Sequence, residues 1–193
     1  PRLPGRRSAA PGLEPQPHDA RGGDHRRAIH GGAAGDRAAR YREVTATIRA
    51  LLDGEDDWIA GVSTTVAELH AAFDFFDWTG VYRLIRPDLL VIGPYQGGHG
   101  CLRIEISRGV CGAAVRAQAT QLVPDVSAFS DHIACSARTR SEIVVPIVTP
   151  TGRTLGVLDV DSNALDAFGE VDREHLEALC GLIGTQFHGV DRL

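Results

Sequence analysis

With 193 residues, of which 43% are apolar, the chain is long enough for one well-buried domain and too short for two comfortable ones. No apolar run approaches the roughly 18–20 residues that a bilayer-spanning helix needs, and no secretory signal is visible, so we expect a cytoplasmic protein with reduced thiols and no membrane partner. Residues 1–40 carry a net charge of +4 and residues 41–193 a net charge of −9, which argues against nucleic acid as a partner.

The first 40 residues differ in composition from the rest of the chain. They are rich in Gly, Pro, Ala and Arg, contain no aromatic residue and have few large aliphatic side chains. A segment of this kind cannot bury enough apolar surface to offset the entropy that it would lose on ordering. We therefore expect residues 1–40 to be a disordered extension and residues 41–193 to form the folded domain.

Two helices are predicted next, each with an apolar stripe at helical spacing. The first starts near Tyr41, ends before Gly54, and has a stripe that consists of Val44, Ile48, Leu51 and Leu52. The second begins after Asp56 or Asp57, because either side chain can accept hydrogen bonds from the first free N–H groups of a helix. Its stripe consists of Ile59, Val62, Val66, Leu69 and Phe73. Both helices are expected to be scaffold.

Short runs of β-branched and aromatic residues, separated by turn residues, predict strands in the middle of the chain. In chain order, the expected strands span residues 78–85, 89–95, 102–106, 121–124, 142–148 and 154–160. A short helix from Gly109 to about Ala117 interrupts them. The turn from Thr149 to Gly152 joins the last two strands into a hairpin. A closing helix is expected from the apolar stripe at Leu176, Leu179, Cys180, Ile183 and Phe187. Helices at both ends and strands with hairpin-like connections predict an α+β fold in which helices cover an antiparallel sheet.

The predicted hairpin gathers acidic residues on one face. When its aliphatic side chains share one face, Val145 pairs with Leu158, Glu142 lies opposite Asp161, and Asp159 shares the face of these two acids. Crowded carboxylates lose solvation and repel one another, which raises at least one pKa. Such a cluster suits proton delivery or the binding of a ligand ammonium group. The alternative, that these acids only end a strand and begin a turn, fits the spacing equally well.

Three of the four cysteines fall inside one 35-residue window: Cys101, Cys111 and Cys135. Cys135 is the candidate nucleophile, since it lies in a polar loop near Arg138 and Arg140, and nearby cations lower a thiol pKa. Cys111 stands where the short helix begins and where the helix dipole would favour a thiolate; it is either a second resolving thiol or a packed residue. Cys180 lies in the closing stripe and is expected to pack in the core. For each loop cysteine, the alternative is a residue without a chemical role.

A zinc site is another use for these thiols, with His132 as a fourth ligand. Structural zinc sites usually contain close pairs such as Cys-x2-Cys. Here nine residues separate Cys101 from Cys111, and twenty-three separate Cys111 from Cys135. The spacing disfavours zinc, and we expect no bound metal.

Seven motifs, in order along the chain, together carry a family resemblance: GPYQG at 93–97, CLRI at 101–104, GVCG at 109–112, VPDV at 123–126, HIAC at 132–135, SEIVVPI at 141–147 and LGVLDVDS at 155–162. Over about residues 41–190, the chain resembles the GAF-domain family of free methionine-(R)-sulfoxide reductases. It departs from the family pattern at Ser130-Asp131, at Ser136 and at Gly98-His99-Gly100, which lie in the loops that carry two of the thiols.

The resemblance implies a six-stranded antiparallel GAF sheet and an enzyme that converts free L-methionine (R)-sulfoxide to L-methionine. By matching motifs, Cys135 corresponds to the catalytic cysteine, which becomes a sulfenic acid. Cys101 corresponds to the resolving cysteine, which forms a disulfide with it, and Cys111 to an auxiliary thiol. No bound cofactor is implied. The reductant is thioredoxin, supplied with electrons from NADPH by thioredoxin reductase, and proteins of this kind are usually homodimers.

The same matching assigns the binding pocket. Glu142, Asp159 and Asp161 correspond to the substrate-pocket carboxylates, and either Glu142 or Asp161 would donate a proton to the departing oxygen. Trp78 and Tyr82 correspond to aromatic residues that line the pocket. The hairpin register reaches the same three acids independently. The rival hypothesis is a non-enzymatic GAF sensor that binds a small molecule, with the cysteines as bystanders or redox reporters.

Overall fold

The computed structural model describes residues 34–131, 133 and 135–190. Within these residues the elements follow in the order α1 (Ala34–Leu51), α2 (Trp58–Ala72), β1 (Trp78–Arg86), β2 (Leu89–Gln96), β3 (Arg103–Glu105), α3 (Gly109–Ala117), β4 (Gln121–Val123), the 3-10 helix η2 (Val126–Ala128), β5 (Ser141–Val148), β6 (Thr154–Ser162) and α4 (Glu170–Gln186). The six strands form one sheet in the order β3-β2-β1-β6-β5-β4, with every neighbouring pair antiparallel. The predicted α+β class and the six-stranded antiparallel sheet are confirmed.

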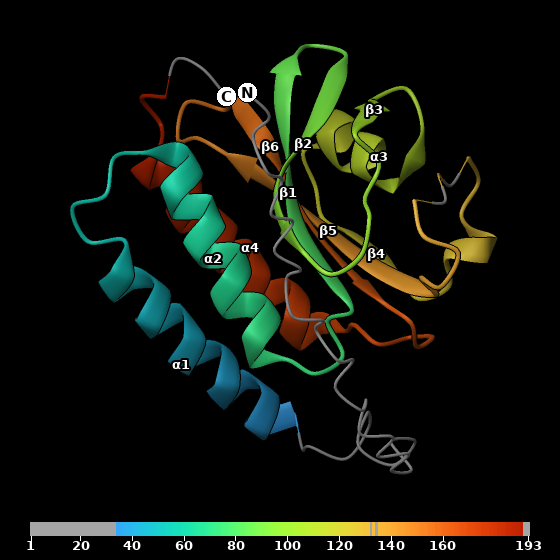
Figure 1. Ribbon diagram of the computed structural model, residues 1–193, viewed down its shortest axis with the longest axis horizontal. Coiled ribbons are helices and arrows are strands. Elements are labelled where there is room, and N and C mark those ends of the chain that lie inside the picture. Colours follow the sequence, from blue (N-terminus) through green and yellow to red (C-terminus); the bar gives the residue numbers. More distant parts are fainter. Residues whose placement is uncertain (1–33, 132, 134, 191–193) are drawn as a thin grey trace, which may run out of the picture.

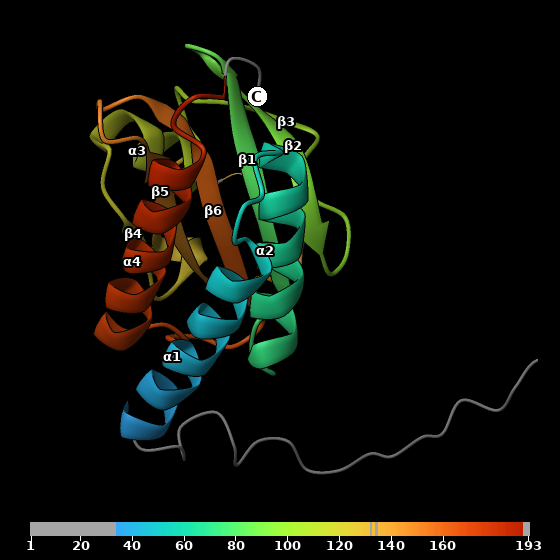
Figure 2. The same cartoon turned by 90° about the vertical axis from the view of Figure 1, so that its left-hand side faces the viewer.

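Helices cover the two faces of the sheet unequally. α2 and α4 pack on one face, and α1 packs on both of these helices (Figures 1 and 2). The larger apolar core lies between this helical layer and the sheet. α3 covers the opposite face, where a second and smaller cluster of buried residues includes the surroundings of three cysteines. Within the described part of the chain, no helix is both long enough and apolar enough to cross a membrane.

α1 begins at Ala34, before the start near Tyr41 that the sequence predicts. Asp172, a residue of α4, holds the first turns of α1 through side-chain hydrogen bonds. Arg37 donates to its buried carboxylate at 2.8 Å, and the Tyr41 hydroxyl donates to the same carboxylate at 2.8 Å. Residues 34–40 are therefore helical rather than part of an extension. The expected disorder of residues 1–33 lies outside the described residues and stays a prediction.

The two predicted N-terminal stripes are only partly correct. Leu51 is 55% exposed and Ile59 is 42% exposed, because the neighbouring Leu52 and Trp58 occupy the buried positions at these helix ends. Of the two predicted capping residues, Asp57 is the one observed, and its side chain accepts from the N–H of Ala60 at 2.8 Å; the remaining residues of both predicted stripes are buried.

The hairpin register is the one that its aliphatic alternation predicts. Val145 pairs with Leu158, and Glu142 pairs with Asp161. β1 pairs with the other edge of β6. There Trp78 lies opposite Asp161, and Gly80 lies opposite Asp159. Since partners across an antiparallel pair share a face, the acids lie on the α3 side of the sheet together with Trp78.

Candidate active site

Three acidic side chains converge on the α3 side of the sheet. β5 supplies Glu142, and β6 supplies Asp159 and Asp161, two residues apart and therefore on the same face. One carboxylate oxygen of each residue lies within 4.8 Å of one oxygen of each of the others. Glu142 is 5% exposed and Asp159 is 6% exposed. The site therefore concentrates acidic groups where water cannot solvate their charges.

This environment favours the protonated form of each acid. Burial, and then the negative charge of Asp161, raise the pKa of Glu142 from 4.5 to about 8. Burial, and then Glu142, raise the pKa of Asp159 well above its ordinary value. Burial, and then Asp159, do the same for the pKa of Asp161. At least one carboxyl group thus keeps a proton near neutral pH, as a general acid must.

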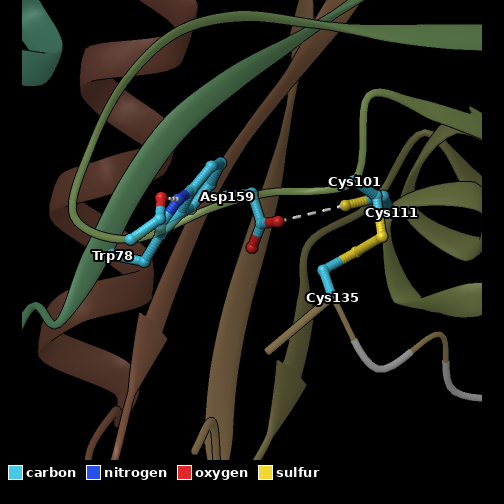
Figure 3. The surroundings of a disulfide bond; sticks show 6 residues. Trp78, Cys101, Cys111, Cys135 and Asp159 are labelled. Carbon is cyan, nitrogen blue, oxygen red and sulfur yellow. Dashed lines mark hydrogen bonds between the residues drawn. A yellow bond between two sulfur atoms is a disulfide. The ribbon is translucent and has the colours of Figure 1, made fainter. Parts of the chain in front are cut away.

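A disulfide joins Cys101 to Cys135 beside the acids (Figure 3). Cys101 lies in the segment between β2 and β3, Cys135 lies in the segment that precedes β5, and their Cα atoms are 5.1 Å apart. Both side chains are half-buried and pack against the smaller apolar cluster. The structure therefore brings together the two cysteines that the family resemblance pairs.

Cys111 stays a free thiol, and its surroundings correct one prediction. Its Sγ donates to Oδ2 of Asp159 at 3.3 Å (Figure 3). Burial, followed by the charges of Asp159 and Glu142, raises the pKa of Cys111 well above its ordinary value. The expectation that the helix dipole favours a thiolate here is wrong, because desolvation and neighbouring acids oppose it. Cys180 lies on the buried face of α4, in the larger core, as predicted.

A pocket enclosing about 390 Å³ of empty space, part of it open to solvent, contains these groups. Its lining combines two cysteines and three acids with mainly aliphatic and hydroxyl side chains: Ile104, Gly109, Val110, Cys111, Ile133, Cys135, Ser136, Thr139, Glu142, Asp159 and Asp161. Cys135 faces the pocket, whereas Cys101 is not among the lining residues.

The two predicted aromatic residues lie next to this pocket and are not among its lining residues. Trp78 and Tyr82 are buried in the same apolar cluster as the cysteines, and their rings stack with centroids 5.8 Å apart. The aliphatic walls formed by Ile104, Val110 and Ile133 had no counterpart in the sequence-based prediction. All three lie within the CLRI, GVCG and HIAC motifs, but their place in the pocket depends on how α3 and the loop before β5 fold over the sheet, which the motifs alone do not show.

The residues weighed above as zinc ligands, and disfavoured by their spacing, do not converge in the described part of the chain. Among the described residues, the cysteines do not join a group of converging metal ligands; the converging group is the acid trio. His132, the possible fourth ligand in that alternative, lies outside the described residues. The absence of a bound metal stays a prediction.

The fold and the site together define a small-molecule GAF domain. The family profile of the GAF domain matches residues 59–187, so the chain is a GAF-domain protein. Two curated relatives carry the name free methionine-R-sulfoxide reductase. The relative from Saccharomyces cerevisiae is 40% identical over 139 residues, which cover 69% of this chain and 77% of that protein. The relative from Escherichia coli is 40% identical over 139 residues, which cover 72% of this chain and 83% of that protein.

A solved structure extends the comparison to a bound ligand. The X-ray structure of free methionine-R-sulfoxide reductase from Neisseria meningitidis, in complex with its substrate, superposes with a TM-score of 0.76 at 45% sequence identity. The match covers 81% of this chain and 93% of that one. The chain belongs to the free methionine-R-sulfoxide reductase family, and the resemblance drawn from its motifs is confirmed.

Proposed function

We propose that this protein reduces free L-methionine (R)-sulfoxide to L-methionine, with Cys135 as the nucleophile. One observation carries the proposal: Cys135, disulfide-bonded to Cys101, lines the same pocket as three acids, of which Glu142 and Asp159 are buried. Relatives at 40% identity bear the name of this activity. A nucleophile and proton donors beside one small pocket are the groups that the reaction needs.

In the first step, the Cys135 sulfur attacks the sulfoxide sulfur. Glu142 or Asp161, protonated at neutral pH because burial raises its pKa, donates a proton to the sulfoxide oxygen. The oxygen passes to the Cys135 sulfur as the sulfur–oxygen bond of the substrate and the sulfur–sulfur bond formed by the attack both break, so that methionine leaves and Cys135 becomes a sulfenic acid. Cys135 is the better candidate for this role than Cys101, since it alone of the two lines the pocket.

In the second step, the thiol of Cys101 attacks the sulfenic sulfur of Cys135. A sulfur–sulfur bond forms and water departs. In the third step, a dithiol carrier reduces this disulfide by exchange and becomes a disulfide itself. We assign the carrier as thioredoxin, with NADPH as the final electron source and no cofactor bound to the protein. A reducing, cytoplasmic compartment suits this cycle.

The acid trio also serves substrate binding. A free amino acid carries an ammonium group, which donates hydrogen bonds. The carboxylate oxygens of Glu142, Asp159 and Asp161 converge in the pocket and can accept them. Trp78 and Tyr82 lie in the smaller apolar cluster, which packs beside the pocket. We further propose a homodimer, which size-exclusion chromatography with light scattering tests directly.

The test is an NADPH-coupled assay with thioredoxin and thioredoxin reductase, which compares the R and S sulfoxides of free methionine. We expect turnover of the R form alone and its complete loss in Cys135→Ser. Cys180→Ala is the matched control: it removes a cysteine that lies in the other core, and it keeps activity.

Each alternative outcome identifies the part of the proposal that fails. Equal use of both epimers would reject the stereochemical assignment. Turnover with dithiothreitol but not with thioredoxin would reject the carrier and leave the reductase standing. Tight stoichiometric binding of a small molecule without turnover would favour a GAF sensor.

A further inference from the structure

The segment that carries Cys101 lies directly on two aromatic side chains. Residues 97–102 connect β2 to β3. The indole N–H of Trp78 donates to the backbone carbonyl of Gly98 at 3.2 Å (Figure 3). The hydroxyl of Tyr82 interacts with the backbone of Cys101. Polar atoms of both rings thus contact this segment, one of them three residues before Cys101 and the other at Cys101 itself.

Two glycines allow this close approach. A Cβ on Gly100 would lie 2.8 Å from Cδ1 of Ile92, 2.9 Å from Cζ2 of Trp78 and 3.0 Å from the hydroxyl oxygen of Tyr82, so the segment would have to move outward. Gly97 has a φ of +106°, in the left-handed region that favours glycine, and a Cβ there would lie 3.0 Å from Cδ1 of Trp78. Gly97, in the GPYQG motif, and Gly100, in the run that departs from the family pattern, therefore let the backbone lie against the rings.

The ring of Trp78 is itself held in place. It stacks on Tyr82 with centroids 5.8 Å apart, and on Tyr95 with centroids 5.6 Å apart. Trp78 is 6% exposed and is not among the pocket-lining residues. The indole nitrogen, the one polar atom of this side chain, thus bonds to the segment that bears Cys101.

We infer that Trp78 is a positioning residue for disulfide formation: its ring and indole N–H hold residues 97–102 so that Cys101 stays within reach of Cys135. The inference rests on the proposed function for its biological meaning. It concerns the second step only, in which the Cys101 thiol attacks the sulfenic acid of Cys135 and water departs. A group that holds the attacking thiol near its target accelerates that step.

The test separates the two steps in a single turnover of fully reduced enzyme without a carrier. Methionine is quantified by chromatography, and the disulfide by acid quench, alkylation and mass spectrometry. Trp78→Phe keeps an aromatic ring and loses the N–H. We expect the rate of disulfide formation, relative to the rate of methionine formation, to fall roughly two- to tenfold, the factor that one net hydrogen bond supports.

A pair of neighbouring glycines supplies a second variant and its matched control. Gly100→Ala adds a methyl group against Trp78 and should also slow disulfide formation without slowing methionine formation. Gly98→Ala adds a methyl group that has no atom within 4 Å, and it should behave as wild type. Gly100→Ala leaves the indole intact. If Trp78→Phe does not fold, the rate of disulfide formation in Gly100→Ala, compared with that in Gly98→Ala, still tests the inference.

The contrary result is equally clear. If the Trp78→Phe variant forms methionine slowly but forms the disulfide at the wild-type rate, Trp78 serves the substrate and the inference is wrong. Equal disulfide rates in Gly100→Ala and Gly98→Ala would also overturn it. A parallel experiment oxidises Cys135 with hydrogen peroxide, which forms the sulfenic acid without any sulfoxide. A wild-type protein that makes no methionine would refute the proposed function, while the peroxide experiment still decides the role of Trp78.

Discussion

Replacing Glu142 with glutamine should change how the stability of the protein depends on pH. The buried carboxyl of Glu142 has its pKa raised from 4.5 to about 8 by burial and by Asp161. Between these two values the folded protein keeps a proton that the unfolded chain releases. Stability conferred by the protonated group is therefore complete below about pH 4.5 and is lost as the pH rises toward 8. Glutamine has the same shape and cannot ionise, so Glu142→Gln removes this loss.

The size of the effect follows from the width of the window. Each pKa unit corresponds to about 1.4 kcal/mol of free energy. From pH 5 to pH 8 the unfolded carboxyl is mostly ionised and the folded one mostly protonated, which gives a loss of about 3 kcal/mol in the free energy of unfolding of the wild type relative to Glu142→Gln. Asp159 and Asp161 have pKa values raised in the same direction, so both proteins lose further stability as the pH rises. Because the charge of Glu142 helps to raise the pKa of Asp159, the variant loses less stability through Asp159, which adds to the expected difference.

Urea denaturation at pH 5 and pH 8, on the disulfide form of both proteins, measures this difference. We expect the Glu142→Gln variant to gain on the wild type as the pH rises, so that it is the more stable of the two at pH 8. Two parallel curves, with a difference that changes by less than about 1 kcal/mol, would show that burial does not hold the proton on Glu142.

Three further predictions concern other parts of the fold. Asp172→Ala leaves the Tyr41 hydroxyl without its buried acceptor and should lower the free energy of unfolding in urea by about 3 kcal/mol; a loss below about 1 kcal/mol would contradict this. Gly184→Ala places a methyl group against a β5 carbonyl oxygen and should destabilise by about 1–3 kcal/mol, whereas Gly181→Ala on the same helix meets open space and should not; equal melting temperatures would refute it. Iodoacetamide at neutral pH should leave Cys111 unmodified in the native reduced protein, because burial and the acids keep it a thiol; rapid alkylation seen by mass spectrometry would oppose that.

The hairpin shows why part of the site could be predicted from the sequence. Alternation with a period of two determines which residues of β5 and β6 share a face, and the aliphatic set admits one register. The facing acids Glu142 and Asp161 follow from that register alone. Local spacing was sufficient here because the two strands are joined by a short turn.

Other features depend on contacts between distant segments. The start of α1 depends on Asp172, which lies far along the chain in α4. The protonation of Cys111 depends on how α3 seats it against Asp159. The pairing of Cys101 with Cys135 came from the family resemblance, since spacing alone left the partners open. Tertiary packing, rather than local pattern, decides each of these.

The most direct test of the central claim is a single turnover of the Cys101→Ser variant with free methionine (R)-sulfoxide. This variant lacks the thiol that resolves the intermediate, so the reaction should stop after one equivalent of methionine, with a sulfenic acid on Cys135 that dimedone traps for mass spectrometry. Absence of methionine, or a dimedone adduct on Cys111 in place of Cys135, would contradict the account.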